Sequence, residues 1–425
     1  MNRIILIGNG FDLAHGMKTT YKDFLDSFWS NKINNIKNTF QGRIFEDEDI
    51  LIKNVPTHLI SECSNYQEIK STLNNYGSKI EYKNLFLEKI TEQGDLKKWV
   101  DIENEYYILL KNCYKGLLTS NINISKLNKD FQRIKDLLND YLVTIEEGFN
   151  KIANNTPILR KRNSIGHKIF SKYKIKELTE KLKNLEIDKH YELVKNDYQK
   201  FLNKDGTFSE DLLDEYRKKL FQRLSRPFTK KDFRELLSSE YGEGCIDLTP
   251  EQTLILNFNY TSTDSFYSNP SKYKYYSFDN VTNAQEIHIH GSNKIEDENP
   301  IIFGFGDELD EDYKEIEKLN DNQYLENIKS IKYLETDNYK KLLEFANSDY
   351  YQICIMGHSC GTSDRTMLNT LFEHKNCCSI KVYYHQKDEK HDNYSNIVMN
   401  ISRNFNDKKK MRERVVNKTY CSPLC

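Results

Sequence analysis

The sequence feature that most constrains the fold is a short β-branched run at residues 3–7, which glycines end at once. The run reads Arg-Ile-Ile-Leu-Ile and is followed directly by Gly8-Asn9-Gly10. A brief apolar run bounded by turn residues is typical of a strand buried in a parallel sheet. The run is also too short for the apolar core of a secretory signal peptide. A strand, a glycine turn and a helix are therefore expected to open the chain.

Strands of the same kind return only near the end of the sequence. We predict them at Thr253–Phe258, Lys274–Phe278, Glu286–Ile289, Ile301–Phe303, Ile353–Met356 and Ser379–Tyr384. Helical patterns at Tyr339–Ala346 and Thr366–Phe372 alternate with the last of these strands. Strands that alternate with helices favour a parallel sheet, so the predicted fold class is α/β.

The intervening residues, from about 22 to 240, have apolar side chains at helical spacing. These side chains are Leu127, Phe131, Ile134, Leu138, Tyr141, Ile145 and Phe149, then Leu212, Leu213, Tyr216, Leu220 and Phe221. We therefore predict a discontinuous α/β domain, residues 1–21 plus 250–425, and a helical insertion, residues 22–249. The insertion is expected to add no strand to the centre of the sheet and to serve as a lid, an oligomer interface or a sensor.

Composition limits the compartment and the partners. Only 38% of the residues are hydrophobic, yet 28 Tyr and 22 Phe supply the bulk for a core. The formal net charge of −2 argues against a basic nucleic-acid coat. The nine scattered cysteines suit a reducing cytosol, and Cys421 with Cys425 lacks the second pair of a zinc ribbon, so no metal is expected. No apolar run approaches the roughly 18 residues of a membrane span, which predicts a cytoplasmic protein without a membrane partner.

The first candidate site is the turn from Gly8 to Asp12. Two glycines after a strand let backbone N–H groups approach a pyrophosphate at the start of a helix. Leu13 stands where a G-x-G-x-x-G fingerprint has its third glycine. A tight strand-to-helix turn explains the same residues equally well.

Two further candidates follow predicted strands, where open α/β sheets bind ligands. Asn259 comes directly after the strand at Thr253–Phe258, although an Asn at such a place commonly only caps a turn. His290, followed by Gly291, fits a general base exposed to a cleft. His288 shares its strand face, but spacing places no third metal ligand, so we interpret His288 as structural.

The fourth candidate, Gly357-His358-Ser359-Cys360-Gly361, matches the G-x-S-x-G nucleophile elbow of serine hydrolases. Its acid and base would have to come from the short tail that follows. The candidates there are His374, His385, His391, Asp364, Asp388 and Asp392. The same glycines and Ser359 also suit close contact with a nucleotide, so both interpretations remain open.

Five segments, in order, resemble the NAD-binding core of sirtuins. Gly8-Asn9-Gly10 with Gly16-Met17 is similar to G-A-G-(x5)-G-I-P, Phe258-Asn259 to part of T-Q-N-I-D, His290-Gly291 to the catalytic His-Gly, Phe303–Asp307 to F-G-E, and Met356–Ser359 to the late G-T-S. The resemblance implies a Rossmann-like, mostly parallel sheet of sirtuin-like type, interrupted here by the large helical insertion.

A closer resemblance, over most of the chain, is to the AbiH family of bacterial phage-resistance proteins. It is carried by Ile7–Gly16, Tyr21–Phe24, Trp99–Glu103 and Gly357–Leu368. It implies phage defence by abortive infection without itself supplying a reaction. The resemblance to the sirtuin core implies NAD as the substrate. A homo-oligomer and a phage-derived trigger or partner protein are also expected.

The chain departs from sirtuins at three points. Thr261 replaces the Asp of the second motif, Lys18 replaces the Pro of the first, and the four-cysteine zinc module is absent. Protein deacylation is therefore disfavoured. The remaining chemistry is hydrolysis of the nicotinamide–ribose bond, an NAD glycohydrolase activity. A serine hydrolase built on Ser359 and a nucleotide sensor without turnover are the alternatives.

In this hypothesis Asn259 orients water or a ribose hydroxyl, His290 accepts the proton, and Asp12 stabilises the cation or binds a hydroxyl. The expected cofactor contacts are Gly8, Asn9, Gly10, Phe11, Gly291, Asp307, Gly357, Ser359 and Asp364. Asn259 and His290 should face a dinucleotide-sized cleft of roughly 300–1,000 Å³. His288 is expected to be the buried histidine of the pair, and Asp101 with Glu103 to be a solvated helix face.

Overall fold

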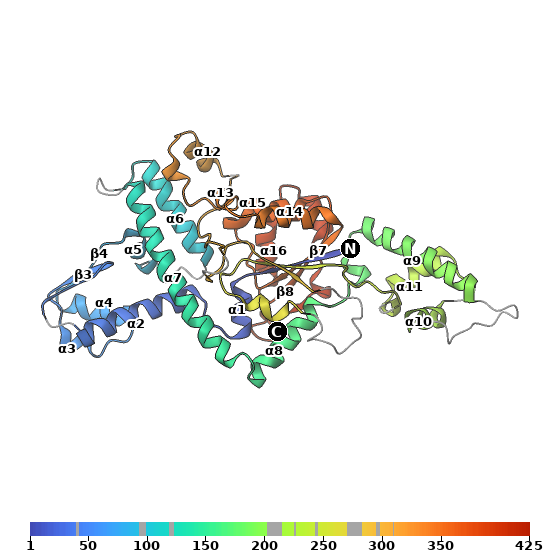
Figure 1. The fold of residues 1–425 in the computed structure, drawn as a ribbon, viewed down its shortest axis with the longest axis horizontal. Helices are drawn as coiled ribbons and strands as arrows, with labels where there is room; N and C mark the ends of the chain where they lie inside the picture. Colours follow the sequence, from blue (N-terminus) through green and yellow to red (C-terminus); the bar gives the residue numbers. More distant parts are fainter. Residues whose placement is uncertain are drawn as a thin grey trace.

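A six-stranded parallel sheet lies at the centre of the molecule, with helices on both faces (Figure 1). The computed structural model describes residues 1–39, 42–92, 99–118, 123–201, 215–224, 227–242, 245–269, 283–294, 298–308 and 310–425. Across the sheet the strands are β6 (Gln285–His288), β5 (Thr253–Asn257), β1 (Asn2–Ile7), β7 (Tyr351–Met356), β8 (Cys377–Tyr384) and β9 (Ser422–Pro423). Every neighbouring pair is parallel, which confirms the predicted α/β class.

The central strand β1 shows why both faces of the sheet are covered. All six of its residues are buried, and successive side chains point to opposite faces. Ile4 and Leu6 pack into one core with α14 (Asn338–Ser348), α15 (Arg365–Glu373) and α16 (Tyr394–Arg403). Ile5 and Ile7 pack into another with α1 (Asn9–His15) and α8 (Thr156–Ile169). Helix α8 comes from the insertion, so the insertion covers part of the sheet.

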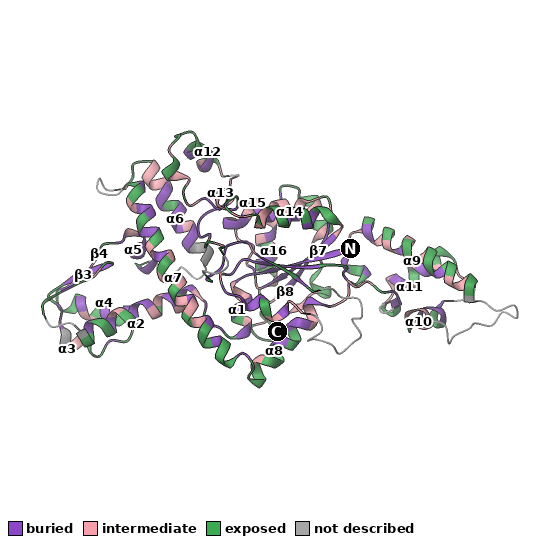
Figure 2. Cartoon of the chain, viewed as in Figure 1, coloured by how far each residue is buried: buried purple, intermediate pink, exposed green. Residues whose placement is uncertain are grey.

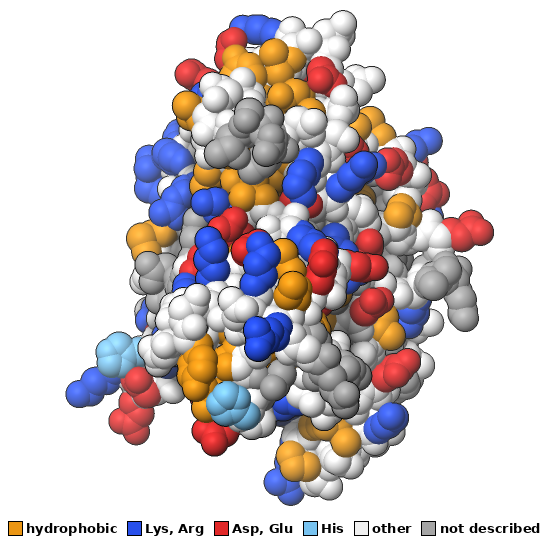
Figure 3. Space-filling view, turned by 90° about the vertical axis from the view of Figure 1, so that its left-hand side faces the viewer, with side chains coloured by type: hydrophobic (Ala, Val, Ile, Leu, Met, Phe, Trp, Pro, Cys, Tyr) orange, Lys and Arg blue, Asp and Glu red, His pale blue; other side chains and the backbone are white. Residues whose placement is uncertain are grey.

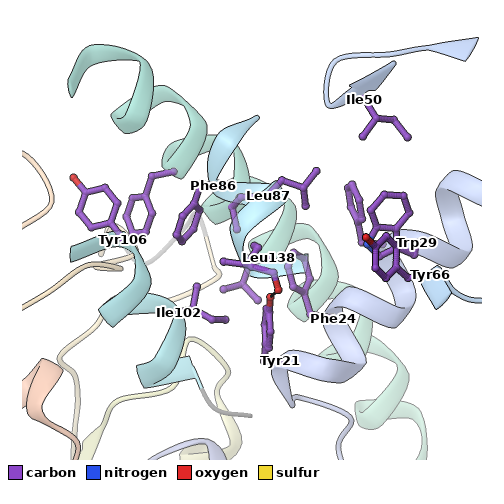
Figure 4. Close-up of a cluster of buried hydrophobic side chains, with 14 of the residues drawn as sticks. Tyr21, Phe24, Trp29, Ile50, Tyr66, Phe86, Leu87, Ile102, Tyr106 and Leu138 are labelled. Atoms are coloured by element: carbon purple, nitrogen blue, oxygen red, sulfur yellow. Dashed lines mark hydrogen bonds between the residues drawn. The ribbon is translucent and has the colours of Figure 1, made fainter. Parts of the chain in front are cut away.

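The rest of the insertion projects from the sheet in two directions (Figures 1 and 2). One unit, which we call the α2–α7 unit, has its own aromatic-rich core (Figure 4). Its elements are α2 (Tyr21–Thr39), β2 (Ile44–Glu46), β3 (Ile50–Lys53), α3 (Thr57–Ile60), α4 (Tyr66–Asn75), β4 (Ile80–Tyr82), α5 (Leu85–Glu92), α6 (Trp99–Tyr114) and α7 (Ile124–Ile152). The other unit contains α9 (Glu180–Phe201), α10 (Glu215–Arg223) and α11 (Lys230–Ser238).

The segment after β6 connects the sheet to the α2–α7 unit. Phe303 stacks on Phe131 and Phe305 stacks on Tyr107, with ring centroids 5.0 and 3.8 Å apart. The segment continues through α12 (Glu311–Glu317) and α13 (Lys329–Lys332). The chain ends after α17 (Lys408–Arg414) with β9. Through this segment the residues near β6 are fixed by both parts of the molecule.

The structure confirms five of the predicted strands and the long apolar stripe of α7, and it corrects two expectations. Ile301–Phe303 is not a strand, because it forms no ladder with a described strand; Ile302 and Phe303 instead pack as loop residues into two different cores. The insertion is not purely helical, since β2, β3 and β4 form an antiparallel sheet within it. The predicted strand at 274–278 and residues 212 and 213 lie outside the described residues.

The described surface gives two further observations. Lys and Arg side chains are interspersed with Asp and Glu on the face in Figure 3. None of the described helices combines the length and the hydropathy that crossing a bilayer requires.

Two strand-end turns pack backbone against backbone beside β1. The N–H of Gly10 donates to the carbonyl oxygen of Gly357 at 2.9 Å, and Ile7 forms a bridge with Gly357. A Cβ on Gly357 would lie 2.1 Å from the Phe11 nitrogen, and one on Gly10 would lie 2.7 Å from the Gly357 oxygen. Gly357 also has a φ of +79°, which side chains rarely adopt. These glycines are explained by the contact between the two turns.

We expect Gly357→Ala to destabilise the fold by about 3 kcal/mol or more, because the clash is with backbone and the φ is positive. Gly148→Ala is the matched control: it lies within α7 with nothing near its Cβ and should stabilise by up to about 1 kcal/mol. Urea unfolding measures both. Equal stabilities for the two variants would contradict the role given to the Gly10–Gly357 contact.

Candidate functional site

The carboxyl ends of four neighbouring strands bring the candidate residues to one edge of the sheet. Asn257 at the end of β5 is in register with His288 at the end of β6. The N–H of Asn293, after β6, donates to the carbonyl oxygen of Tyr260, after β5. Glu146 of α7 ties the same loops together, accepting from the Ser262 N–H and from Asn293 Nδ2. The insertion therefore closes over this edge of the sheet.

Two backbone N–H groups of the glycine turn after β1 are already hydrogen-bonded to backbone carbonyls. The Gly10 N–H is bonded to Gly357, and the Phe11 N–H donates to the carbonyl oxygen of Gly8 at 2.7 Å. The Asn9 side chain accepts from the Thr19 hydroxyl at 2.6 Å. In this arrangement neither Gly10 nor Phe11 offers its N–H to a pyrophosphate.

Asp12 is a fully buried carboxylate that binds the loop after β5. Its two oxygens accept hydrogen bonds from the hydroxyls of Thr261 and Thr263, both at 2.7 Å. Burial raises its pKa to about 7 against the effect of these hydrogen bonds, and nearby Glu146 and Asp264 act in the same direction as burial. Thr261, the departure from the sirtuin pattern, is thus the partner of Asp12.

Asn259 lies in the loop that Asp12 holds. Asn257 organises this loop: its Oδ1 accepts from the Asn259 N–H, and its Nδ2 donates to the Thr261 carbonyl and to Asp264. The Asn259 side chain is 8% exposed, and its Nδ2 has no hydrogen-bond partner among the residues that the structure describes. Leaving a buried amide donor unpaired costs about 1–3 kcal/mol, so this atom is a candidate ligand contact.

The two histidines of the motif are buried in the opposite order from the prediction. His290 is only 4% exposed, whereas His288 is partly exposed and its Nε2 lies 2.8 Å from Asp264 Oδ2. The strand ends at His288 and the chain turns at Gly291, whose φ is +87°. Strand alternation therefore does not extend to His290. The predicted open cleft between Asn259 and His290 is closed.

His290 is enclosed by polar and aromatic groups. Its Nε2 lies 3.2 Å from Asp364 Oδ1 and 3.1 Å from the Tyr333 hydroxyl, and the Phe258 ring is 5.0 Å away. Burial, and after it Lys329, lowers the His290 pKa to about 4, although Asp364 opposes this. A carboxylate can only accept a hydrogen bond, so Nε2 carries the hydrogen and Nδ1 is the nitrogen that can accept a proton.

Lys329 and Glu103 belong to the same cluster, and sequence reasoning missed both. Lys329 Nζ lies 2.8 Å from Asp364 Oδ1 and 2.7 Å from Glu103 Oε1. The expectation that Glu103 is a solvated helix face is wrong, because it is buried against Lys329; the side chain of Asp101 lies outside the described residues. Burial alone would raise the Asp364 pKa, but Lys329 and His290 hold it well below its usual range.

The remaining residues that were predicted to contact the cofactor either lie at this edge of the sheet or shape the loops that support it. Asp307 accepts from Arg365 at 3.3 Å. A Cβ at Gly291 would lie 2.2 Å from the Pro300 oxygen, so this glycine is required by the turn itself. His358 Nε2 lies 3.5 Å from Asp364 Oδ2, which joins the Gly357 loop to the His290 cluster.

Ser359 lacks the contacts of a triad nucleophile. A nucleophile elbow strains the serine itself, yet the positive φ angles here belong to Gly357 and Cys360. In the described parts of the chain, no hydrogen bond joins the Ser359 hydroxyl to a histidine. His374 stacks on Tyr351, and His391 pairs with Asp388 on an exposed loop.

A hollow of about 470 Å³ lies beside the closed site, between α7 and the loop after His290. Lys135, Asp136 and Asn139 of α7 line one side. Ser292, Asn293, Lys294, Glu298, Asn299, Pro300 and Ile301 line the other. Its volume falls in the range of small-molecule sites, but the hollow is separate from Asn259 and His290 in this arrangement.

Comparison with known proteins assigns the sequence to a family. No curated protein and no solved structure matches the chain. The family model described as bacteriophage abortive infection AbiH matches residues 4–385. This range includes most of β1, the α2–α7 unit and the whole His290 cluster. The chain therefore belongs to the AbiH family of bacteriophage abortive-infection proteins.

Proposed function

We propose that this abortive-infection protein is an NAD glycohydrolase, which depletes NAD by hydrolysing the nicotinamide–ribose bond. The observation that carries the proposal is the pairing of His290 with Asp364 at the carboxyl edge of a parallel sheet, where the neighbouring loop after β5 holds the unpartnered amide of Asn259. A neutral histidine held by a carboxylate is suited to accept a proton from water. A buried amide with an unused donor is suited to orient a hydroxyl or water.

The strand order supports a dinucleotide as the ligand. Numbered in chain order within this sheet, the strands run 3-2-1-4-5-6, the order of the Rossmann fold. Dinucleotides bind such sheets at the point where the order reverses, which here lies between β1 and β7. The Gly8–Gly10 turn and the Gly357 loop meet at this point. This is the support for a Rossmann-like site of sirtuin-like type.

In the proposed reaction the bond from nicotinamide nitrogen to ribose C1′ breaks through an oxocarbenium-like transition state. The leaving nicotinamide departs as a neutral molecule, since it takes the bonding electron pair. Water oriented by Asn259 bonds to C1′, and its proton passes to Nδ1 of His290. Gly357, Ser359 and Asp364 would border the adenosine side.

His290 and Asn259 are 4% and 8% exposed, so NAD can reach them only when the covering segments move. A closed site agrees with the family role, because an abortive-infection effector must stay silent until infection. Opening by a phage-derived trigger is part of the proposal. The serine hydrolase alternative has no supporting contact at Ser359, and a nucleotide sensor without turnover is separated from the proposal by the assay below.

We expect infection to release nicotinamide from NAD in cells that carry the wild-type protein. His290→Ala and Asn259→Ala should each reduce the release by about 10²-fold or more, because a positioned base typically contributes about 10²–10⁴-fold. His290→Gln, which keeps a polar side chain but cannot serve as the base, should be equally defective. The matched controls are His385→Ala and Asn347→Ala, whose side chains are exposed.

Thermal unfolding of the purified variants shows whether the fold survives each substitution. Normal nicotinamide release by a folded His290→Ala variant would refute the assignment of the base. Phage protection without any loss of NAD in the wild type would favour the sensor.

We assign Asp12 to holding the Asn259 loop, because both of its oxygens are occupied by threonine hydroxyls. Its folded pKa of about 7 lies above the ordinary value of 3.8. The folded state therefore binds more protons between these values, and the stability that this carboxyl contributes at low pH is lost as the pH rises through 7.

The stability advantage of the wild type over Asp12→Asn should accordingly shrink between about pH 4 and about pH 7, when measured by urea unfolding. The buried histidines titrate in both proteins, so their effects cancel in the comparison. An advantage that stays constant or grows with pH would mean that Asp12 is ionised throughout.

A further inference from the structure

Lys329 and His290 contact the same oxygen of one carboxylate. Lys329 Nζ is 2.8 Å from Asp364 Oδ1, and His290 Nε2 is 3.2 Å from that same atom. The other oxygen, Oδ2, faces His358 Nε2 at 3.5 Å. The lysine thus shares the oxygen that orients His290 and that would stabilise its protonated form.

Lys329 is fixed on its other side by the insertion. Glu103 of α6 lies 2.7 Å from Lys329 Nζ, and both side chains are buried. The Lys329 backbone is also held, since its N–H donates to the Phe305 carbonyl at 2.8 Å. Taking an ammonium group out of water is costly unless it is paired. Glu103 and Asp364 together therefore keep Lys329 charged and in place.

We propose that Lys329, anchored by Glu103, is a positioning residue that competes with His290 for Asp364 and so limits the basicity of His290. The meaning of this competition for catalysis rests on the proposed function, in which His290 is the base. The competition itself is a property of the folded chain and can be measured without NAD.

The direction of the effect follows from the charges around His290. The titratable groups that face it are Asp364 before α15, Lys329 and Tyr333 at the two ends of α13, and His358 after β7, with Glu103 behind Lys329. The positive charge of Lys329 opposes protonation of the imidazole, and Asp364 favours it. Without Lys329, His290 is the one cationic partner that Asp364 Oδ1 can have in this cluster, so the imidazole should bind a proton more readily.

The arrangement also connects the insertion to the site. Glu103 belongs to α6, within the core of the α2–α7 unit. A displacement of α6 that drew Glu103 and Lys329 away from Asp364 would strengthen the His290–Asp364 pair. The insertion would then control the base through one ion pair.

The test is a proton NMR titration of His290 in the full-length protein, with the signal assigned by its loss in His290→Gln. The main variant is Lys329→Met with Glu103→Met, which removes both charges together, so that Glu103 is not left unpaired and Asp364 keeps the two histidines as its partners. Wild-type His290 should not titrate above about pH 5, whereas in the double variant its midpoint should rise by about one unit or more.

Controls separate the role of Lys329 from general disturbance. Lys332→Met with Glu335→Gln removes an exposed ion pair at the other end of α13 and should leave the titration unchanged. Glu103→Gln alone should also leave His290 untitrated above about pH 5, because Lys329 still faces Asp364. If the Met pair does not fold, Lys329→Gln with Glu103→Gln replaces it.

An unchanged His290 midpoint in a folded double variant would overturn the proposal. Because the titration is read without substrate, a shifted midpoint in a protein that leaves NAD intact in phage-infected cells would support the competition while refuting the glycohydrolase. Where the glycohydrolase holds, the double variant should also release nicotinamide faster at neutral pH, since a base works best with a pKa near the working pH.

Discussion

The structure depends on the parallel pairing of β1 on both of its sides. Four of its residues pair with β5 on one side and all six pair with β7 on the other, and both partners lie far along the chain. The entropy of closing a loop grows only slowly with its length, so a long insertion between β1 and β5 is tolerated. The pairing also places the ends of β1, β5, β6 and β7 at one edge. Every candidate catalytic residue follows one of these ends.

Charge burial is the second constraint, and it joins the two parts of the chain. Lys329 is buried between Glu103 of the insertion and Asp364 of the sheet region, beside His290. Breaking such a cluster by removing one member costs about 3–5 kcal/mol, so the site and the α2–α7 unit are energetically linked. Glu146 adds a second link by holding the loops after β5 and β6. In an abortive-infection protein, such links would give an incoming signal a physical path to His290, the proposed base.

Sequence patterns predicted the elements whose signal is local. The predicted strand β1 and the predicted helix α7 are both found. The continuous apolar run of β1 reflects burial on both faces of the sheet, and the spaced apolar residues of α7 reflect burial on one face of the helix. The hairpin of β2 and β3 was missed, because its turn at 47–49 reads Asp-Glu-Asp and lacks the glycine that marks a tight hairpin in sequence. The site was harder to predict. From the sequence alone, Glu103 is expected to be solvated, because its partner Lys329 is far away along the chain. The burial of His290 could not be derived from strand alternation, because β6 ends at His288.

The central claim is that the edge formed by these four strand ends is a dinucleotide site. Hydrogen exchange measured by mass spectrometry, with and without NAD, tests it most directly when the protein is taken from phage-infected cells, where the account has the site open. His290→Gln is the protein to use, because it should retain the site without consuming NAD. We expect NAD to slow exchange in the segments that follow β1, β5, β6 and β7, with no change in α9–α11. Saturating NAD that leaves these segments unchanged, or protects only other regions, would contradict the account.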